Sequence, residues 1–363
     1  MAALFAFIAI DFRQNVSGLG VLTASFYIGL GIFQIPGGIL AAKYGPRRTA
    51  MYGMVLSSAA VFLTAFTSEF YQFVLLRFFV GVGMALFFGP GVTLIAKAFR
   101  NESQGFGVGI FNGAFYVGAA LGLFAWSVLA EAAGWRLSIA VGGALGILGG
   151  VLLLACLPKD ELRSGFVVKM VDLRRILSNR WLLLLSLELF GIGSGTILVN
   201  TFMVYYLEQT LKLGPAAAGI IGSLSPLGAI IVSPLFGIAY DRMQRARVLL
   251  FILGCMLAVA VAIASIGSIF SAIAATLIAG ASSGAFTVSY LSARKATTGS
   301  REYESLAVSW VNCIQMFAGF WSPVAFSLIV ISFGYATSWL VAAVYTFFLI
   351  SIILLGKESQ KQS

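Results

Sequence analysis

The amino-acid sequence predicts an all-α, multi-pass membrane protein made of two six-helix bundles related by a pseudo-two-fold axis. Composition is the first indication: 60% of the 363 residues are hydrophobic and only 10% are charged, too few charges for a soluble surface. Apolar runs of about 20 residues, long enough to cross a bilayer core, recur along the whole sequence. The third indication is an internal repeat, in which Gly38 matches Gly237 and Gly81 matches Gly280 with a spacing of 199 residues.

The apolar runs define the helices in order. They predict membrane spans at residues 17–41, 49–67, 71–96, 105–130, 135–157, 181–206, 214–240, 248–268, 270–293, 305–331 and 335–356. A short apolar segment, residues 1–10, precedes them, but a helix of that length reaches only about 15 Å, half of the hydrocarbon core. The repeat would place the partner of the helix at 181–206 about eighteen residues before Met1. We therefore expect the first helix to be truncated in this sequence.

The predicted domains follow from this helix order. We expect an N-terminal six-helix bundle at 1–157 with an incomplete first helix, and a C-terminal six-helix bundle at 181–356. Between them lies a central loop at 158–180 with six basic and three acidic residues, and a tail follows at 357–363. Both the central loop and the tail are expected to be cytoplasmic, because most basic residues lie on their side of the membrane.

The basic residues are distributed unevenly between the two ends of the helices. When the helices are taken in order, 19 of the 23 Lys and Arg residues fall on the side of the central loop and the C-terminus. Only Arg13, Arg136 and Lys212 fall on the opposite side, and Arg77 lies within a span. By the positive-inside rule, the loop side is cytoplasmic. We therefore interpret the net charge of +10 as a topology signal in a cell-membrane protein, and not as a nucleic-acid-binding surface.

Several kinds of chemistry are disfavoured by what the sequence lacks. Histidine is absent and all three cysteines lie within predicted spans without a ligand spacing, so we expect neither a metal nor another cofactor. An ATP-driven pump needs a Gly-x4-Gly-Lys-Ser/Thr loop, which does not occur. The segment 280–284 matches the G-x-S-x-G pattern of serine hydrolases, but it lies inside a predicted helix, and there is no histidine to activate its serine. We therefore expect the protein not to be an enzyme.

The repeated sequence motif lies between two predicted helices in each half. Its first copy is carried by Gly38, Lys43, Gly45, Arg47 and Arg48, and its second by Gly237, Asp241 and Arg242. The motif resembles the signature of the major facilitator superfamily, in which a glycine, an acid, a basic residue, a second glycine and a basic pair join helices two and three. The resemblance covers the whole sequence. It implies a secondary transporter that works by alternating access of two bundles around a midplane cavity.

The two copies differ at the acidic position of this signature. Ala42 occupies it in the first copy and Asp241 in the second. The resemblance implies that such a carboxylate helps to latch one conformation against a helix N-terminus, where the helix dipole favours negative charge. We therefore expect the latch from Asp241 alone. The alternative is that both loops only anchor in lipid headgroups.

A second resemblance concerns the span at 71–96. Its segment from Arg77 to Ala85 resembles a family signature, an arginine followed by a Gln-Gly-x-Gly run, with Val80 in place of the glutamine. The family's antiporter signature requires a Gly-Pro pair in helix five, whereas the span at 105–130 keeps small residues but has no proline. This difference favours symport over drug export.

Two charged residues lie well inside predicted spans, where a charge is costly. Arg77 is about seven residues from the outer end of its helix and Glu188 about seven from the inner end, so each is roughly 10 Å deep. We interpret Arg77 as a cavity residue that attracts a carboxylate or tunes a proton site, and Glu188 as a carboxylate that loads and releases protons. The alternative for both is a structural ion pair or a polar contact.

Uncharged polar residues also cluster in the middle of spans. Asn112 and Tyr116 share one helix face, as do Asn312 and Gln315. Because Asn112 and Asn312 are equivalent in the repeat, the pseudo-two-fold axis would place them on opposite walls of one cavity. Interhelical hydrogen bonding is the alternative. The predicted pathway for substrate or protons is completed by Asn200, Tyr205 and Ser282.

Together these patterns predict secondary active transport of a small organic solute, a carboxylate, by alternating access with coupling to protons. The expected partners are the solute, protons or another co-transported ion, and the lipid bilayer, and the protein is expected to be a monomer. One alternative is proton-driven efflux of amphipathic compounds. The alternative from another class is a membrane sensor that binds a solute without transporting it.

Overall fold

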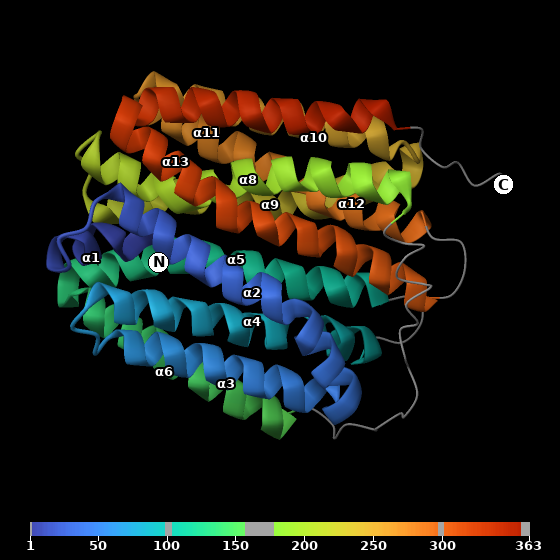
Figure 1. The fold of residues 1–363 in the computed structure, drawn as a ribbon, viewed down its shortest axis with the longest axis horizontal. Helices are drawn as coiled ribbons and strands as arrows, with labels where there is room; N and C mark the ends of the chain where they lie inside the picture. The colour runs from blue at the N-terminus through green and yellow to red at the C-terminus, as the bar shows by residue number, and fades with distance from the viewer. Residues whose placement is uncertain (1, 99–103, 157–177, 297–300, 357–363) are drawn as a thin grey trace. The chain divides into compact units, whose positions relative to one another are not determined.

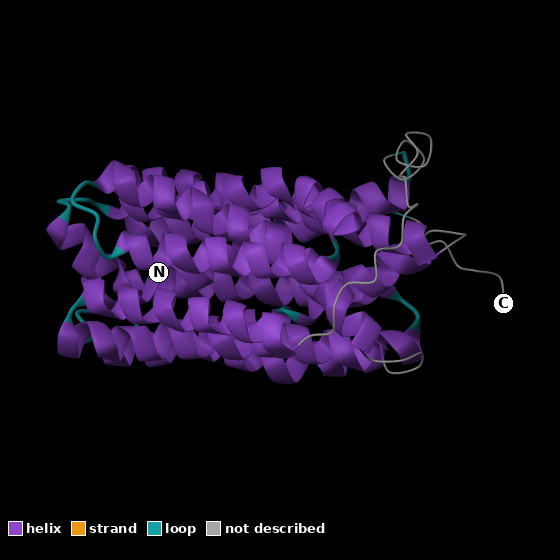
Figure 2. Cartoon of the chain, turned by 90° about the horizontal axis from the view of Figure 1, so that it is seen from below, coloured by secondary structure: helices purple, strands orange, loops and turns teal. Residues whose placement is uncertain are grey.

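The computed structural model of the chain describes residues 2–98, 104–156, 178–296 and 301–356 (Figure 1). The elements in these ranges are all helices, as Figure 2 shows. Nine helices of the described ranges are long and apolar enough to cross a membrane, as expected for a multi-pass membrane protein. The chain divides into two compact units, Ala3–Phe166 and Val167–Ser363. We call them the N-terminal and C-terminal units and describe each by itself.

The described residues of the N-terminal unit form a short first segment followed by five long helices. Its elements are η1 (Ala2–Leu4), α1 (Phe5–Asp11), α2 (Val16–Tyr44), α3 (Pro46–Thr64), α4 (Phe70–Ala98), α5 (Gln104–Ala133) and α6 (Trp135–Cys156). Asn15 caps α2 by accepting a hydrogen bond from the Ser17 N–H at its Oδ1 (2.9 Å), which satisfies a donor of the first turn. Within this unit α2 packs against α4, α4 against α3, and α3 against α6.

The C-terminal unit contains the remaining helices. Its elements are α8 (Arg180–Gln209), α9 (Pro215–Met243), α10 (Ala246–Ile263), η3 (Ala264–Ile266), α11 (Ile269–Ser282), α12 (Gly284–Lys295), α13 (Arg301–Ser351) and η4 (Ile352–Leu355). The longest shared surface joins α8 to α13, which appear yellow-green and orange-red in Figure 1. α9 packs against α11 and α12, and α10 packs against α11 and α13.

Two breaks subdivide the helices of the C-terminal unit. Gly334 interrupts α13 with φ of 79° and ψ of 172°, at the boundary expected between the spans 305–331 and 335–356. The expected span 270–293, in contrast, consists of two helices, α11 and α12, that meet at Ser283. There the Ser283 N–H bonds to the Gly280 carbonyl (3.1 Å), three residues back, so the turn is locally tighter than an α-helix. Two glycines and two serines in the segment 280–284 explain the break, because both residue types disfavour helix interiors.

Close helix crossings occur at equivalent positions in the two units. A Cβ atom at Gly81 on α4 would overlap the carbonyl oxygen of Phe26 on α2. A Cβ atom at Gly280 on α11 would overlap the carbonyl oxygen of Ser225 on α9 in the same way. Gly81 and Gly280 are 199 residues apart, and so are Phe26 and Ser225. The repeat in the sequence therefore extends to the contact of one helix backbone with another.

Positive φ angles recur with the same spacing. Arg13 and Lys212, with φ of 51° and 54°, are 199 residues apart. Gly45 and Gln244, with φ of 92° and 50°, are also 199 residues apart. Their ψ angles differ, because Gly45 has ψ of 146° whereas Gln244, with ψ of 27°, is in the left-handed helical region. The repeat therefore extends to the sign of φ at matched turns, and not to the full backbone path.

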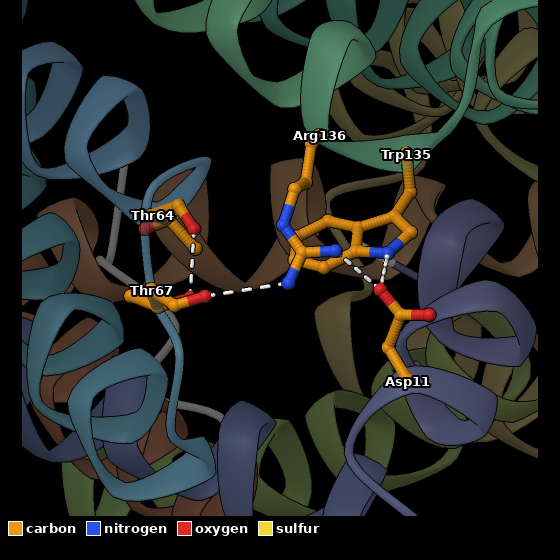
Figure 3. A network of polar contacts seen from close by, with 5 residues as sticks. All are labelled: Asp11, Thr64, Thr67, Trp135 and Arg136. Atoms are coloured by element: carbon orange, nitrogen blue, oxygen red, sulfur yellow. Dashed lines mark hydrogen bonds and ion pairs between the residues drawn. The ribbon is translucent and has the colours of Figure 1, made fainter.

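A polar network holds α1 to the rest of the N-terminal unit (Figure 3). Asp11 Oδ2 accepts a hydrogen bond from Trp135 Nε1 (2.8 Å) and forms an ion pair with Arg136 at the start of α6. Arg136 also donates to the carbonyl oxygen of Thr67, in the turn between α3 and α4 (3.3 Å). The indole hydrogen bond and the neighbouring guanidinium hold the pKa of Asp11 below its usual range. Three chain segments far apart in sequence therefore meet at the Arg136 guanidinium.

Candidate functional site

Glu188 lies at the contact between α8 and α12. Its side chain is fully buried, and Ser289 Oγ on α12 donates a hydrogen bond to its Oε2 (3.2 Å). The other carboxylate oxygen, Oε1, is buried and has no hydrogen-bond partner in the described part of the chain. Burying a polar atom without a partner is costly. Glu188 is therefore not a fully satisfied structural contact.

The next residue of α12 contacts a different helix. Tyr290 Oη donates to Asn312 Oδ1 (2.7 Å) and lies 3.3 Å from Gln315 Oε1, both on α13. Consecutive residues of an α-helix point about 100° apart, so Ser289 contacts α8 while Tyr290 contacts α13. Asn312 and Gln315 are both buried. We call Glu188, Ser289, Tyr290, Asn312 and Gln315 the polar cluster.

A third contact of the polar cluster is between α8 and α13. A Cβ atom at Gly193 on α8 would lie 2.9 Å from Gln315 Cγ, which is too close for an undisturbed contact. The missing side chain at Gly193 therefore allows Gln315 to lie against α8, about one and a half turns from Glu188. The polar cluster thus lies where α8, α12 and α13 meet.

The end of α12 is attached to the start of α8. Trp181 Nε1 donates to Ser292 Oγ (3.0 Å), and Asn179 Nδ2 donates to the Ala296 carbonyl (3.3 Å). Asn179 also caps α8, because its Oδ1 accepts from the Trp181 N–H (3.0 Å). These bonds fix how far α12 is displaced along α8, and they keep Ser289 level with Glu188.

The other predicted residues of the C-terminal unit lie outside the polar cluster. Asn200, about three turns after Glu188 on α8, has a buried Oδ1 without a partner among the described residues. Tyr205, near the end of the same helix, is buried. Ser282 Oγ donates to the Ile278 carbonyl of its own helix (2.8 Å). The hydroxyl hydrogen of Ser282 is thus used within α11.

In the N-terminal unit, Arg77 on α4 lines a partly open cavity of about 170 Å³. The walls also include Thr64, Trp126 and Ser138, from three other helices. The guanidinium lies 4.9 Å from the centroid of the Phe26 ring, within the range of a cation–π contact. Its Nε atom is buried and has no hydrogen-bond partner in the described part of the chain. Arg77 therefore combines an unused donor with a cavity.

The predicted pair Asn112 and Tyr116 lies on α5. Tyr116 is half-buried, whereas the side chain of Asn112 is outside the described residues. The arrangement of Asn112 and Asn312 on opposite walls of one cavity therefore stays a prediction.

The repeated motifs form the turns between α2 and α3 and between α9 and α10. Gly45 ends α2 and precedes α3, and Gln244 ends α9 at the equivalent position. Lys295 Nζ, at the end of α12, donates to Gln244 Oε1 and lies 4.7 Å from the centroid of the Tyr240 ring. The second motif is therefore attached to the same helix that carries Ser289 and Tyr290.

Most motif residues lie at helix ends. Gly38 and Gly237 belong to α2 and α9, Arg47 and Arg48 to the first turn of α3, and Arg242 is exposed in the last turn of α9. The side chains of Lys43 and Asp241 are outside the described residues. The latch role of Asp241 stays a prediction.

Sequence reasoning missed Ser289 and Tyr290. The segment 287–292 reads Thr-Val-Ser-Tyr-Leu-Ser within an otherwise apolar span. Ser289 and Ser292 are three residues apart and share a helix face, and both contact α8. The polar helix face formed by Ser289 and Ser292 was the sequence feature that could have indicated a contact with the helix of Glu188.

A chain of long apolar helices, arranged in two repeated units with polar groups buried within the spans, defines a multi-pass membrane transporter fold. A family model described as Major Facilitator Superfamily matches residues 1–209 and 189–363. The chain therefore belongs to the major facilitator superfamily. Proteins of this family are transporters and not enzymes.

Curated relatives are similar over part of their length. A nitrite extrusion protein of Bacillus subtilis (strain 168) is 26% identical over 252 residues, which cover 69% of this chain and 63% of that protein. The probable galactarate/D-glucarate transporter GudP of Escherichia coli (strain K12) is 24% identical over 269 residues, 65% of this chain and 60% of that protein. The chain thus spans about three fifths of the length of these relatives.

Solved structures share the fold. A mutant of the nucleoside transporter NupG superposes with a TM-score of 0.77 at 15% identity, covering 98% of this chain and 94% of that chain. A bacterial homolog of the human lysosomal transporter Spinster, in an inward-facing and occupied conformation, gives a TM-score of 0.76 at 16% identity. It covers 98% of this chain and 91% of that chain. At this level of identity the likeness concerns the fold alone.

Proposed function

We propose that the protein is a secondary active transporter that moves a small organic anion, a carboxylate, by alternating access with coupling to protons. The observation that carries this proposal is the polar cluster, in which the fully buried Glu188 has one oxygen without a partner among the described residues and Tyr290, next to its partner Ser289, contacts Asn312. Membership in a transporter family supports solute transport. The relatives named for nitrite and for galactarate or D-glucarate support an anion as the solute.

Arg77 is the residue of the N-terminal unit that we propose to bind the anion. A buried cation is costly unless it is paired, and Arg77 makes no ion pair within the described residues. A cavity of about 150 Å³ can hold a molecule the size of benzene, so the cavity beside Arg77 has room for a small carboxylate. A carboxylate there would supply the missing charge and an acceptor for Nε.

Glu188 is the proposed site of proton coupling. A carboxylate buried without a cation is destabilised when charged, and Ser289 is its sole recorded hydrogen-bond partner among the described residues. We infer that Glu188 carries a proton while it is enclosed and releases it when a conformational change hydrates it. This exchange would link one proton to each movement of the transporter.

The experiment that tests the coupling uses the full-length chain reconstituted in vesicles. Uptake of labelled D-glucarate is measured with and without an inwardly directed proton gradient, for wild type, Glu188→Gln and the exposed control Glu131→Gln. The expected result is that Glu188→Gln loses gradient-driven accumulation by at least about tenfold, a factor equivalent to 1.4 kcal/mol, but retains solute exchange. Equal dependence on the gradient in Glu188→Gln and wild type would exclude Glu188 as the coupling site.

The same vesicles test Arg77 and the competing functions. Arg77→Gln is expected to weaken D-glucarate affinity by about tenfold or more, while exchange of the exposed Arg13 for Gln leaves it unchanged. Unchanged affinity in Arg77→Gln would remove the anion role of Arg77. Binding of D-glucarate without any transport would indicate a membrane sensor. Transport restricted to amphipathic cations would indicate a proton-driven exporter of amphipathic compounds.

A further inference from the structure

Two amide side chains converge on one phenol in the C-terminal unit. Tyr290 Oη lies 2.7 Å from Asn312 Oδ1 and 3.3 Å from Gln315 Oε1. A phenol has a single hydrogen to donate, so the two carbonyl oxygens share it. The oxygen and nitrogen of an amide lie on opposite edges of its plane. Because both oxygens are directed to Tyr290, both NH2 groups are directed away from it.

These NH2 groups are unused donors. Asn312 and Gln315 are each only 8% exposed, and each amide nitrogen carries two N–H donors. No hydrogen bond from either nitrogen is recorded among the described residues, and neither nitrogen is completely enclosed. A donor in such a place is unsatisfied unless a solute or water supplies an acceptor. The ligand group that matches the two NH2 groups is therefore a set of oxygen atoms that accept hydrogen bonds.

We propose that Tyr290 is a positioning residue that presents the N–H edges of Asn312 and Gln315 to the solute. The C-terminal unit then selects solutes that carry hydroxyl oxygens in addition to a carboxylate, that is, hydroxycarboxylates. This inference rests on the proposed transport of a carboxylate and adds a reason for discrimination among carboxylates.

The phenol matters because an amide can rotate by half a turn. Without Tyr290 Oη, either amide can present its oxygen or its nitrogen, and the preference for acceptors in the solute is lost. A site whose polar groups are fixed in advance avoids the cost of ordering them on binding. Such a site rejects an analogue that lacks the matching hydroxyl groups, because its own polar groups are left unpaired.

The test compares two probes that differ only in hydroxyl groups. D-Glucarate and adipate are dicarboxylates of equal chain length, and adipate lacks the hydroxyl groups. Binding of each to the purified full-length protein is measured by titration, for wild type, Tyr290→Phe and the exposed control Tyr52→Phe. Wild type and Tyr52→Phe are expected to prefer D-glucarate by about tenfold or more. Tyr290→Phe is expected to bring the ratio close to one, mainly by weakening D-glucarate binding.

The ratio of D-glucarate affinity to adipate affinity distinguishes a positioning role of Tyr290 from a general folding defect. A variant that is partly unfolded loses both ligands equally, whereas the proposal predicts a selective loss of D-glucarate. Asn312→Leu, which removes one donor pair, is expected to reduce the ratio in the same direction. If Tyr290→Phe and Asn312→Leu keep the wild-type ratio, the positioning role is wrong although carboxylate transport stands. If wild type binds neither probe, the hydroxycarboxylate proposal and the carboxylate function are both overturned.

Discussion

Two pairs of charged residues in the described chain differ in depth and in pairing. Asp11 and Arg136, at helix ends, form the one ion pair recorded in the described ranges, and both are partly exposed. Arg77 and Glu188, within their helices, have no ion pair there, and each keeps an unpartnered polar atom. The alternative to a functional role for both buried residues was a structural ion pair or a polar contact. No ion pair is recorded for either residue in the described ranges, whereas Glu188 makes a polar contact with Ser289. The functional roles of Arg77 and Glu188 stay predictions.

The Asp11 network gives a prediction about pH and stability. The pKa of Asp11 is lowered in the folded protein by the Trp135 hydrogen bond and by Arg136. A group with a lowered folded pKa stabilises the fold above its unfolded pKa of about 3.9, and this contribution disappears as the pH falls through the folded value. We expect Asp11→Asn to lower the melting temperature at pH 7. Because the pair is partly exposed, the effect is at most about 1 kcal/mol.

The measurement is thermal unfolding in detergent between pH 3 and pH 7. Wild type, Asp11→Asn, Arg136→Gln and the double variant form a cycle that isolates the coupling between the two side chains. The difference between wild type and Asp11→Asn should shrink below about pH 4. A difference of constant size across this range would show that the charge of Asp11 does not contribute.

The sequence located part of the site, for physical reasons that differ between residues. Glu188, Asn312 and Gln315 were predictable because a polar side chain in an apolar span stands out. Ser289 and Tyr290 were not, because serine and tyrosine are common in membrane helices and their importance depends on what faces them. The cavity beside Arg77 depends on side chains from several helices, so it could not be read from one segment.

At the scale of helices, glycine determines how closely two elements approach. In the N-terminal unit the approach is between α2 and α4 at Gly81, and in the C-terminal unit between α9 and α11 at Gly280. A backbone carbonyl occupies the space that a Cβ atom would need in both cases. A backbone cannot move aside as a flexible side chain can, so a methyl group there must separate the helices.

These crossings predict the effect of a single methyl group. Gly81→Ala and Gly280→Ala are each expected to destabilise the protein by about 1–3 kcal/mol through overpacking. Gly118→Ala is the matched control, because a Cβ atom at that position on α5 would meet nothing within 4 Å. The control is expected to be neutral or slightly stabilising, since alanine is the better helix former.

Thermal unfolding of the three alanine variants provides the measurement. Loss of stability at Gly81 and Gly280 but not at Gly118 is the expected pattern. If Gly81→Ala is as stable as Gly118→Ala, the crossing of α2 and α4 has room for a methyl group and the overpacking argument is wrong.

Helix ends were predictable to within a few residues wherever a strong local signal marked them. Gly334 separates two spans as expected, because glycine readily adopts its positive φ. The break at Ser283 was not predicted, since the apolar pattern continues across it and only the weak helix formers of the segment 280–284 mark it. Apolar length alone therefore identifies spans but not interruptions within them.

At the scale of the whole molecule, the repeat governs sequence, turn geometry and packing together. The residues Arg13 and Lys212 both have a positive φ angle, and so do Gly45 and Gln244. The likeness of geometry does not extend to chemistry, because Ala42 occupies the position of the N-terminal half that is equivalent to Asp241. The two units are therefore similar in backbone structure but carry different polar and charged side chains.

The charge asymmetry predicts the orientation of the protein in the membrane. In a variant without native cysteines, we expect Arg13→Cys and Lys212→Cys to react with a membrane-impermeant maleimide in intact cells. Gln244→Cys is expected to react only after permeabilisation, because the positive-inside rule places its loop in the cytoplasm. All three positions are exposed, so accessibility is set by the side of the membrane. The reverse labelling pattern would contradict the cytoplasmic assignment of the central loop and C-terminus.

The hydrogen bond from Ser289 to Glu188 has a consequence for biosynthesis. The two residues are 101 positions apart, and Glu188 is synthesised first. At about 5–20 residues per second, the ribosome needs about 5–20 s to reach Ser289. Throughout that interval α8 is a nascent segment whose carboxylate lacks its later neighbour. Its insertion into the bilayer is therefore easiest with a neutral carboxylic acid, and the timing of translation becomes part of how this helix is accommodated.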